Sequence, residues 1–467
     1  MRTGEDLSAF ARLLESYQEP GKSALRDVVR FVNLKFLVPG SRIFYGAAPI
    51  FPLMSHRVPR APRVVPMTIA ALAAGVMAPS SGEELTSKAP GRLEGEVDSR
   101  IVPQTGPRLD ELTGKKRTEE LEMGIAISAA YDDNIFLSPN AQSDFVVKVA
   151  PSIKWRKGDP VEGEGGYLSI AYKPTAVAYA DFSSNDRIDQ VAAWETGWRG
   201  KAIKLAYSGE ARALGDATAD TGTLTDRTEF VNEARISWSV RERVAVEVAA
   251  GYESTAYDDS KFADSNYTYG EVALRYAYSP KTTLGVAYKF GRFEVDGAGP
   301  QDVHRTTARI EWKPREKIAI DLEVGAEHRT FDSGSDTTPV VEARIGWTPK
   351  EGTEVYLQGY RRERASAYLA GQNYTQGGVA LGIVQRLGDK WSARLEGGVE
   401  RSEYSRVSGT GAAGREDKIH FIRPALEYRF TDDFSMGLYY RYSENSSNNP
   451  AFGYENHSAG VEMGYHF

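Results

Sequence analysis

Oppositely charged residues recur on alternating segments of the chain, and they are the side chains best placed to do chemistry. They stand two or four positions apart, which puts both members on one face of a β-strand. The candidates are Glu233, Arg235, Glu271, Arg275, Arg309, Glu311, Asp321, Glu323, Glu342, Arg344, Glu427 and Arg429. On facing walls of a pore, these groups would create a transverse field that orients polar solutes. On neighbouring strands, they would instead pair and stiffen the wall.

The segments that carry these charges alternate apolar and polar residues with a period of two, as half-buried strands do. In one of them Ile320, Leu322 and Val324 oppose Asp321 and Glu323. The segments come in pairs joined by short turns, and longer loops rich in Gly, Asp, Asn and Ser separate the pairs. Units that begin at residues 234, 273, 308 and 343 repeat at intervals of 39, 35 and 35 residues.

This pattern predicts an all-β fold, a transmembrane antiparallel up-and-down β-barrel of about eighteen strands that spans residues 119–467. Sixteen strands are the alternative, because the segments between residues 166 and 213 are the hardest to assign. The short turns are expected on the periplasmic side and the longer loops on the extracellular side. The twelfth strand is predicted at residues 339–347.

Six of the seven tryptophans lie within a few residues of a predicted short turn. They are Trp155, Trp198, Trp238, Trp312, Trp347 and Trp391. A belt of tryptophans at one level is typical of a lipid–water interface, whereas β-propensity alone would scatter them along the strands. We therefore expect these residues to form a membrane-interface girdle.

The segment before the barrel has a different composition. Residues 54–78 contain three arginines, a short apolar core and then small residues, which is the pattern of a signal peptide. Met54 is therefore the expected start of translation, and residues 1–53 are interpreted as an upstream extension. Residues 79–118 are polar and rich in Gly and Pro, which predicts a flexible periplasmic linker. Cysteine is absent, which excludes disulfides and thiol chemistry.

The chain ends in GVEMGYHF, in which Val461, Met463, Tyr465 and Phe467 alternate with small or polar residues. Chain ends usually fray, so an alternation that reaches the last residue predicts a strand held in a sheet. The stretch resembles the C-terminal signal by which the barrel-assembly machinery recognises Gram-negative outer-membrane proteins. The resemblance implies a location in the cell outer membrane, with lipid, lipopolysaccharide and that machinery as partners.

A second resemblance rests on Glu122–Trp155 and its two elements, Asp-Asn-Ile-Phe at residues 133–136 and Pro-Ser-Ile at residues 151–153. This stretch is similar to the opening of the beta-barrel porin 2 family. The resemblance implies an outer-membrane barrel. Some members of that family are linked to exopolysaccharide export, which would add a periplasmic polysaccharide-export protein as a partner.

These observations predict a porin-like channel for passive passage of small polar solutes. The alternative is the outer-membrane exit of an exopolysaccharide export system, for which inward tyrosines would be stacking faces. The tyrosines considered are Tyr252, Tyr356, Tyr360, Tyr439 and Tyr440. A structural or adhesive barrel would need a filled lumen.

Other functions are not expected. The six histidines show no pairing with Ser and Asp in any recognisable motif, so no enzyme is predicted. No cofactor and no metal site are predicted. The net charge of −7 removes the basic footprint of nucleic-acid binding. Because the charged candidates form no ring of one sign, weak ion selectivity is expected.

Overall fold

The computed structural model describes residues 119–158, 164–332, 334–368, 372–406 and 414–467. The predicted extension (1–53), signal peptide (54–78) and linker (79–118) lie outside the described residues. No helix in these described ranges is long and apolar enough to cross a membrane.

A single sheet of eighteen antiparallel strands makes up the described fold. Its strands are β1 (Glu119–Asp132), β2 (Asp144–Lys157), β3 (Gly165–Tyr179), β4 (Arg187–Arg199), β5 (Ile203–Leu214), β6 (Arg227–Arg241), β7 (Val244–Tyr257), β8 (Ser265–Ser279), β9 (Thr282–Val295), β10 (Gln301–Arg315), β11 (Ile318–Phe331), β12 (Gly334–Lys350), β13 (Thr353–Ala365), β14 (Gln372–Leu387), β15 (Trp391–Arg406), β16 (Glu416–Arg429), β17 (Phe434–Ser447) and β18 (Tyr454–His466). The predicted count of eighteen is confirmed, and the alternative of sixteen is wrong.

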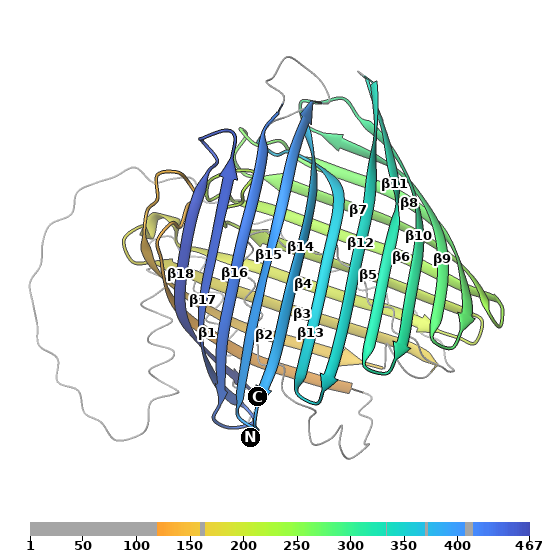
Figure 1. Cartoon of the computed structure of the whole chain (residues 1–467), viewed down its shortest axis with the longest axis horizontal. Helices are drawn as coiled ribbons and strands as arrows, with labels where there is room; N and C mark the ends of the chain where they lie inside the picture. Colours follow the sequence, from red (N-terminus) through yellow and green to blue (C-terminus); the bar gives the residue numbers. More distant parts are fainter. Residues whose placement is uncertain (1–118, 159–163, 333, 369–371, 407–413) are drawn as a thin grey trace, which may run out of the picture. The chain divides into compact units, whose positions relative to one another are not determined.

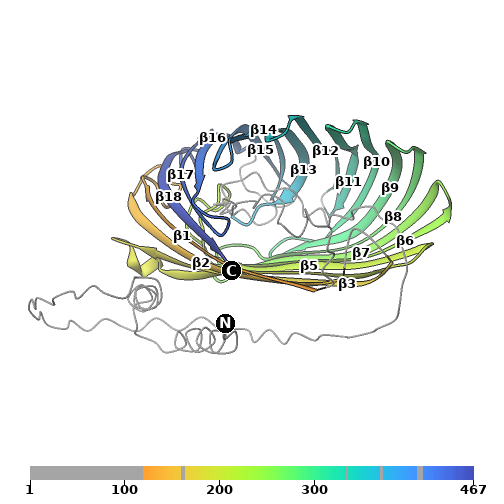
Figure 2. The same ribbon diagram turned by 90° about the horizontal axis from the view of Figure 1, so that it is seen from below.

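The sheet closes on itself, because β1 pairs with both β2 and β18. Figures 1 and 2 show the resulting barrel from the side and from below. The register with β18 runs from Gly124 opposite His466 to Asp132 opposite Ser458. The amide of Phe467 donates a 2.9 Å hydrogen bond to the carbonyl of Met123. The alternation at the end of the sequence is thus part of the closing strand, and closure leaves neither β1 nor β18 as a free edge strand.

The two ends of the barrel differ in their connections. At the short-turn end, pairs such as β6–β7 and β8–β9 are joined by two residues, 242–243 and 280–281. At the loop end the connections are mostly longer, and residues 215–226 join β5 to β6. Backbone hydrogen bonds also link successive short turns to the next hairpin, for example from Lys313 N to Lys281 O at 2.8 Å. This end of the barrel is therefore a continuous, ordered rim.

One strand is longer than predicted. β12 begins at Gly334 instead of residue 339, because its register with β11 continues without a break from Trp347 opposite Ile318 to Gly334 opposite Phe331. The predicted loop is in fact a hairpin that projects at the top of Figure 1. Its residues Ser335, Asp336 and Thr337 are all polar, so hydrophobic alternation does not reveal them as strand.

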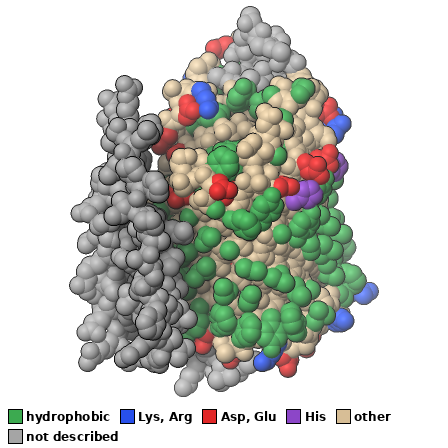
Figure 3. All heavy atoms as spheres, turned by 90° about the vertical axis from the view of Figure 1, so that its left-hand side faces the viewer, with side chains coloured by type: hydrophobic (Ala, Val, Ile, Leu, Met, Phe, Trp, Pro, Cys, Tyr) green, Lys and Arg blue, Asp and Glu red, His purple; other side chains and the backbone are tan. Residues whose placement is uncertain are grey.

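The barrel carries its large apolar side chains on the outside. On β9, the side chains of Leu284, Val286, Tyr288 and Phe290 are 38–56% exposed. Figure 3 shows a band of such side chains, with charged side chains of both signs above and below it and histidine near its upper edge. A soluble protein rarely exposes an apolar surface of this extent, whereas a membrane barrel presents such a band to lipid.

Aromatic residues lie near both edges of this band. Cross-strand pairing places the six predicted girdle tryptophans on the outward face near the short turns. Four of them are 44–51% exposed: Trp238, Trp312, Trp347 and Trp391. Towards the loop end, the Tyr288 hydroxyl and the His304 ring share a 2.7 Å hydrogen bond. Trp312 and His304 are eight residues apart on β10, about 26 Å along the strand. Because barrel strands are tilted by about 35–45°, this length corresponds to a height of roughly 20 Å, a little less than an apolar band of about 25 Å, and the interfacial role of the tryptophans stays a prediction.

Candidate functional site

The barrel encloses a cavity of about 2420 Å³. The cavity extends from short-turn residues such as Lys281 and Lys390 to loop residues such as Asp220 and Ala367. Since side chains alternate along each strand, the outward apolar band leaves the polar positions to face inward. The sequence pattern that makes the outside apolar therefore also makes the cavity polar.

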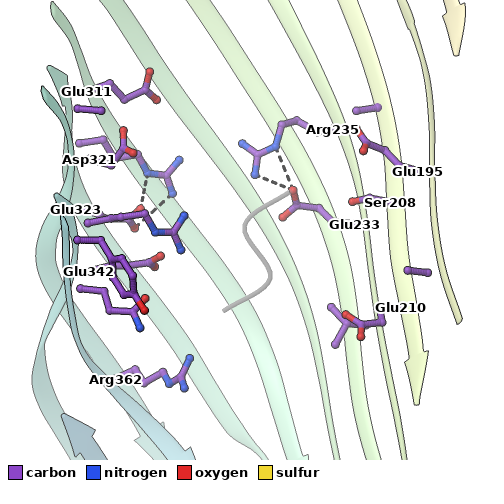
Figure 4. A pocket seen from close by; sticks show the side chains of 18 of the residues that line it. Glu195, Ser208, Glu210, Glu233, Arg235, Glu311, Asp321, Glu323, Glu342 and Arg362 are labelled. Atoms are coloured by element: carbon purple, nitrogen blue, oxygen red, sulfur yellow. Dashed lines mark hydrogen bonds and ion pairs between the residues drawn. The ribbon is translucent and has the colours of Figure 1, made fainter. Parts of the chain in front are cut away.

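All twelve predicted charged residues lie on the wall of this cavity. Figure 4 shows Glu311, Asp321, Glu323 and Glu342 on one side, and Glu233 and Arg235 on the opposite side. Seven of the twelve take part in ion pairs: Glu233, Arg235, Glu271, Arg275, Arg309, Glu311 and Glu323. The other five form no ion pair with any described residue: Asp321, Glu342, Arg344, Glu427 and Arg429.

The paired charges form a network along the wall from β6 to β11. Arg309 donates hydrogen bonds to Glu271 at 2.8 Å and to Glu323 at 2.9 Å. Arg275 reaches Glu247 at 3.1 Å and Glu311 at 2.7 Å. Because each cation lies between carboxylates of strands on either side of its own, the network stiffens the wall and leaves little net charge there.

The tyrosines considered for glycan stacking divide between the two faces. Tyr252 and Tyr440 lie on the outside, 38% and 37% exposed. The hydroxyls of Tyr356 and Tyr360 donate to the inward carboxylates of Glu396 and Glu400. Tyr439 also faces inward and lies against Gly460 of the next strand.

Three inward tyrosines share one arrangement that sequence patterns did not reveal. Each lies in register with a glycine on the next strand and a glutamate on the strand after it. The three sets are Tyr269–Gly251–Glu233, Tyr356–Gly382–Glu396 and Tyr360–Gly378–Glu400. A Cβ at Gly251 would lie 2.2 Å from the Cζ of Tyr269, so only glycine leaves room for that ring against the wall. The arrangement keeps large rings out of the centre of the cavity.

The loop at residues 215–226, here called the crossing loop, spans the loop end of the cavity. It joins β5 to β6, yet its residue Asp220 contacts β15 and the loop after β13, roughly half-way around the barrel. The Asp220 carboxylate accepts hydrogen bonds from Ser366 Oγ at 2.8 Å, the Ala367 amide at 2.7 Å and Tyr404 Oη at 3.1 Å. A segment that joins opposite walls must cross the lumen.

Arg415 fixes the far end of this loop. Its Nη2 donates to the Ala219 carbonyl and to Asp417, both at 2.6 Å. Its guanidinium group also lies over the rings of Tyr404 and Phe452, at 4.4 Å and 3.4 Å from their centroids. The arginine is only 6% exposed, so this anchor is shielded from solvent.

The crossing loop also carries a carboxyl group with a shifted pKa, at the end where the loop joins β6. Burial and the neighbouring Asp258 raise the pKa of Asp226 above its usual range. This residue directly precedes β6. Neither Asp226 nor Asp220 was predicted as a site residue. The only signal for them in the sequence was the length of the loop.

The wall itself is interrupted between β12 and β13 at the loop end. Their pairing stops at Val341 opposite Arg361, although both strands continue. Figures 1 and 2 show the end of β13 bending away from β12 and towards the inside of the barrel. The bend brings Ser366 and Ala367 to the crossing loop, and we call the gap between the two strands the seam.

A buried polar network fills the seam. Its members come from β10 to β14: Gln301, Glu327, Arg329, Thr338, Glu363 and Asn373, all at most 7% exposed. Glu363 accepts from Thr338 Oγ1 at 2.6 Å and from Asn373 Nδ2 at 2.9 Å. Glu327 accepts from Arg329 Nε at 2.7 Å and from Arg305 Nε at 2.6 Å. Side chains thus take the place of the missing backbone ladder.

The part of the chain that the structure describes contains no group of three or more His, Cys, Asp or Glu that could hold a metal ion.

Comparisons with known proteins give distant similarities. The model of the family described as surface lipoprotein assembly modifier matches residues 337–467. OccK7 (OpdD) of Pseudomonas aeruginosa is 12% identical, with 75% of this chain and 99% of that chain covered and a TM-score of 0.41. OccAB3 of Acinetobacter baumannii is 10% identical, with 75% of this chain and 99% of that chain covered and a TM-score of 0.40. The siderophore receptor PirA of P. aeruginosa is 11% identical, with 76% of this chain and 81% of that chain covered and a TM-score of 0.37. No curated protein sequence matches the chain. The resemblance to the beta-barrel porin 2 family stays a prediction.

Proposed function

We propose that the protein is an outer-membrane channel that carries small polar solutes through its lumen. The observation that carries this proposal is the cavity of about 2420 Å³, which runs from the short turns to the crossing loop within a barrel of apolar exterior. A lumen lined by charged side chains offers hydrogen-bonding groups to hydrated solutes along its length. Eighteen strands make a barrel wide enough for an aqueous channel unless loops fill it.

The crossing loop sets the upper limit on solute size in this proposal. It lies across the loop end of the lumen and is held there by Asp220 and Arg415. The segments packed around it belong to three other loops, through Phe262, Tyr368 and Phe452. Solutes must therefore pass beside this packed cap, or the cap must move.

The proposal is tested by single-channel conductance of the purified full chain in a planar bilayer, together with uptake of sugars of increasing size by liposomes. A steady conductance with a size cut-off supports a small-solute channel. If the folded barrel inserts into the bilayer but passes neither ions nor sugars, the protein is not a channel.

Export of an exopolysaccharide is a second candidate. It is favoured by Tyr356, whose ring lies along the cavity wall where a sugar ring could stack on it. Co-purification of a periplasmic export protein with the barrel, together with loss of surface polysaccharide in a Tyr356→Ala strain, would favour export over passive uptake.

A further inference from the structure

Basic residues collect at the short-turn mouth of the cavity. The mouth is defined here by the cavity-lining cations Arg241, Arg243, Lys281, Lys313, Arg386, Lys390 and Arg429. All except Arg429, which is partly exposed, are exposed. They come from five separate hairpin turns and the strand ends beside them, at distant places in the sequence. The barrel thus assembles a cationic rim that no local motif could show.

The rim differs from the wall deeper in the cavity. Arg235, Arg275 and Arg309 each lie within ion-pair distance of two or more carboxylates. None of the seven rim cations forms an ion pair with a residue in the described ranges. The cavity-lining acids at this end are five, Glu242, Glu351, Glu354, Asp389 and Glu427, against seven cations, so the mouth retains a positive excess.

Backbone geometry holds pairs of rim cations close together. Lys313 N donates to Lys281 O at 2.8 Å, and Arg429 N donates to Lys390 O at 2.8 Å. Each bond joins neighbouring hairpins, so two cations from different turns lie side by side. Adjacent like charges raise each other's electrostatic energy, and an anion with several negative groups relieves this repulsion best.

The cavity wall at the opposite end of the barrel carries charges of both signs. Arg227 and Arg329 line it together with Glu229 and Glu363. Arg227 forms an ion pair with Glu229 at 2.8 Å, and Arg329 forms one with Glu327 at 2.7 Å. The two ends therefore differ in the pairing of their cations, because the rim cations have no such carboxylate partners among the described residues.

We propose that the short-turn mouth is a binding site for multivalent anions, solutes that carry two or more carboxylate or phosphate groups. This inference rests on the proposed channel function and names the solute class that the channel concentrates at that mouth. It also replaces the expectation of weak selectivity from charges of mixed sign. That expectation considered strand pairs alone, whereas the unpaired cations lie in and beside the turns.

The test uses the full chain in planar bilayers, with citrate and pyrophosphate as probes and sucrose as the neutral control. Each probe is added to one side at a time. Citrate or pyrophosphate is expected to reduce the current from the short-turn side at concentrations several-fold lower than from the loop side. Block by pyrophosphate but not citrate would assign the site to phosphates, and the reverse would assign it to carboxylates.

Two double variants complete the test. Lys281→Gln with Lys313→Gln should weaken the one-sided block several-fold. Lys317→Gln with Lys350→Gln is the matched control, because it removes two cations at the same end that do not line the cavity. Equal block from both sides, or equal effects of the two double variants, would overturn the anion site while leaving the channel intact. A silent barrel would instead refute the channel itself.

Discussion

Tyr269 on β8 donates a 2.9 Å hydrogen bond to Glu233 on β6, across the bare backbone of Gly251 on the strand between them. Gly251 makes this contact possible, because it has no Cβ that would separate the Tyr269 ring from the wall. The phenol consequently lies along the wall, and the carboxylate that accepts its hydrogen bond is also paired with Arg235. The same relationship, at Tyr356 and Tyr360, connects β13 to β15. These triads set both the stiffness and the free width of the lumen.

Gly251→Val should push the Tyr269 ring into the lumen and lower the conductance. The new side chain would overlap the ring, a type of overpacking that costs about 1–3 kcal/mol. The measurements are single-channel conductance and the urea midpoint of unfolding. Gly346→Ala is the matched control, since a Cβ at Gly346 meets no atom within 4 Å; equal effects of both changes would contradict the role of the triad.

Asp220→Ala should release the crossing loop and raise the conductance several-fold. The change removes the acceptor of three hydrogen bonds that connect the loop to the opposite wall. Each lost bond is worth about 1 kcal/mol. Asp259→Ala is the control, because this exposed loop carboxylate pairs only with nearby Lys261. An unchanged conductance in Asp220→Ala would show that the loop does not limit passage.

Glu327→Leu should destabilise the barrel strongly, by about 3–5 kcal/mol, because Arg305 and Arg329 would lose the carboxylate between them. Glu327 is 1% exposed. Glu311→Gln removes an exposed partner of Arg275 and should cost less than about 1 kcal/mol. Urea unfolding followed by tryptophan fluorescence compares the two. A small effect of Glu327→Leu would mean that the seam does not depend on its polar network.

Phe467→Ala should slow assembly of the barrel in cells without changing the stability of the folded protein. The side chain is 58% exposed on the outside, and the contact with β1 is made by its backbone amide. The measurements are the rate at which the protease-resistant barrel appears in a pulse-chase experiment and the urea midpoint of the purified protein. A normal rate would argue against the resemblance to a barrel-assembly signal.

Most strands could be predicted because the sequence alternates on them without interruption. Membrane barrels expose one face to lipid and the other to water, so the period of two survives along the full length of a strand such as β9. The same period of two then fixes which charges share the inner face, as for Arg309 and Glu311 on β10. The hairpin of β12 escaped prediction because both of its faces are polar above the membrane band.

The crossing loop, the seam and the cationic rim could not be predicted from local patterns. Asp220 meets Ser366 and Tyr404 only because the barrel closes and brings β6 opposite β13–β15. The end of β13 leaves its partner for contacts with that loop, and no periodicity encodes such a departure. The rim similarly arises from turn residues that are ordinary when taken one turn at a time. Each feature depends on closure, which is a property of the whole sheet.

A shortened crossing loop tests conduction through the lumen and its narrowing by that loop together. Ala217 and Leu224 form an antiparallel bridge, so residues 218–223 can be replaced by two glycines without breaking β5 or β6. The single-channel conductance of this variant is measured beside that of the unaltered chain. We expect a measurable conductance in the unaltered chain and a several-fold higher one in the variant. Equal conductances would show that the loop does not narrow the lumen, and no conductance in either protein would show that the barrel is not a channel.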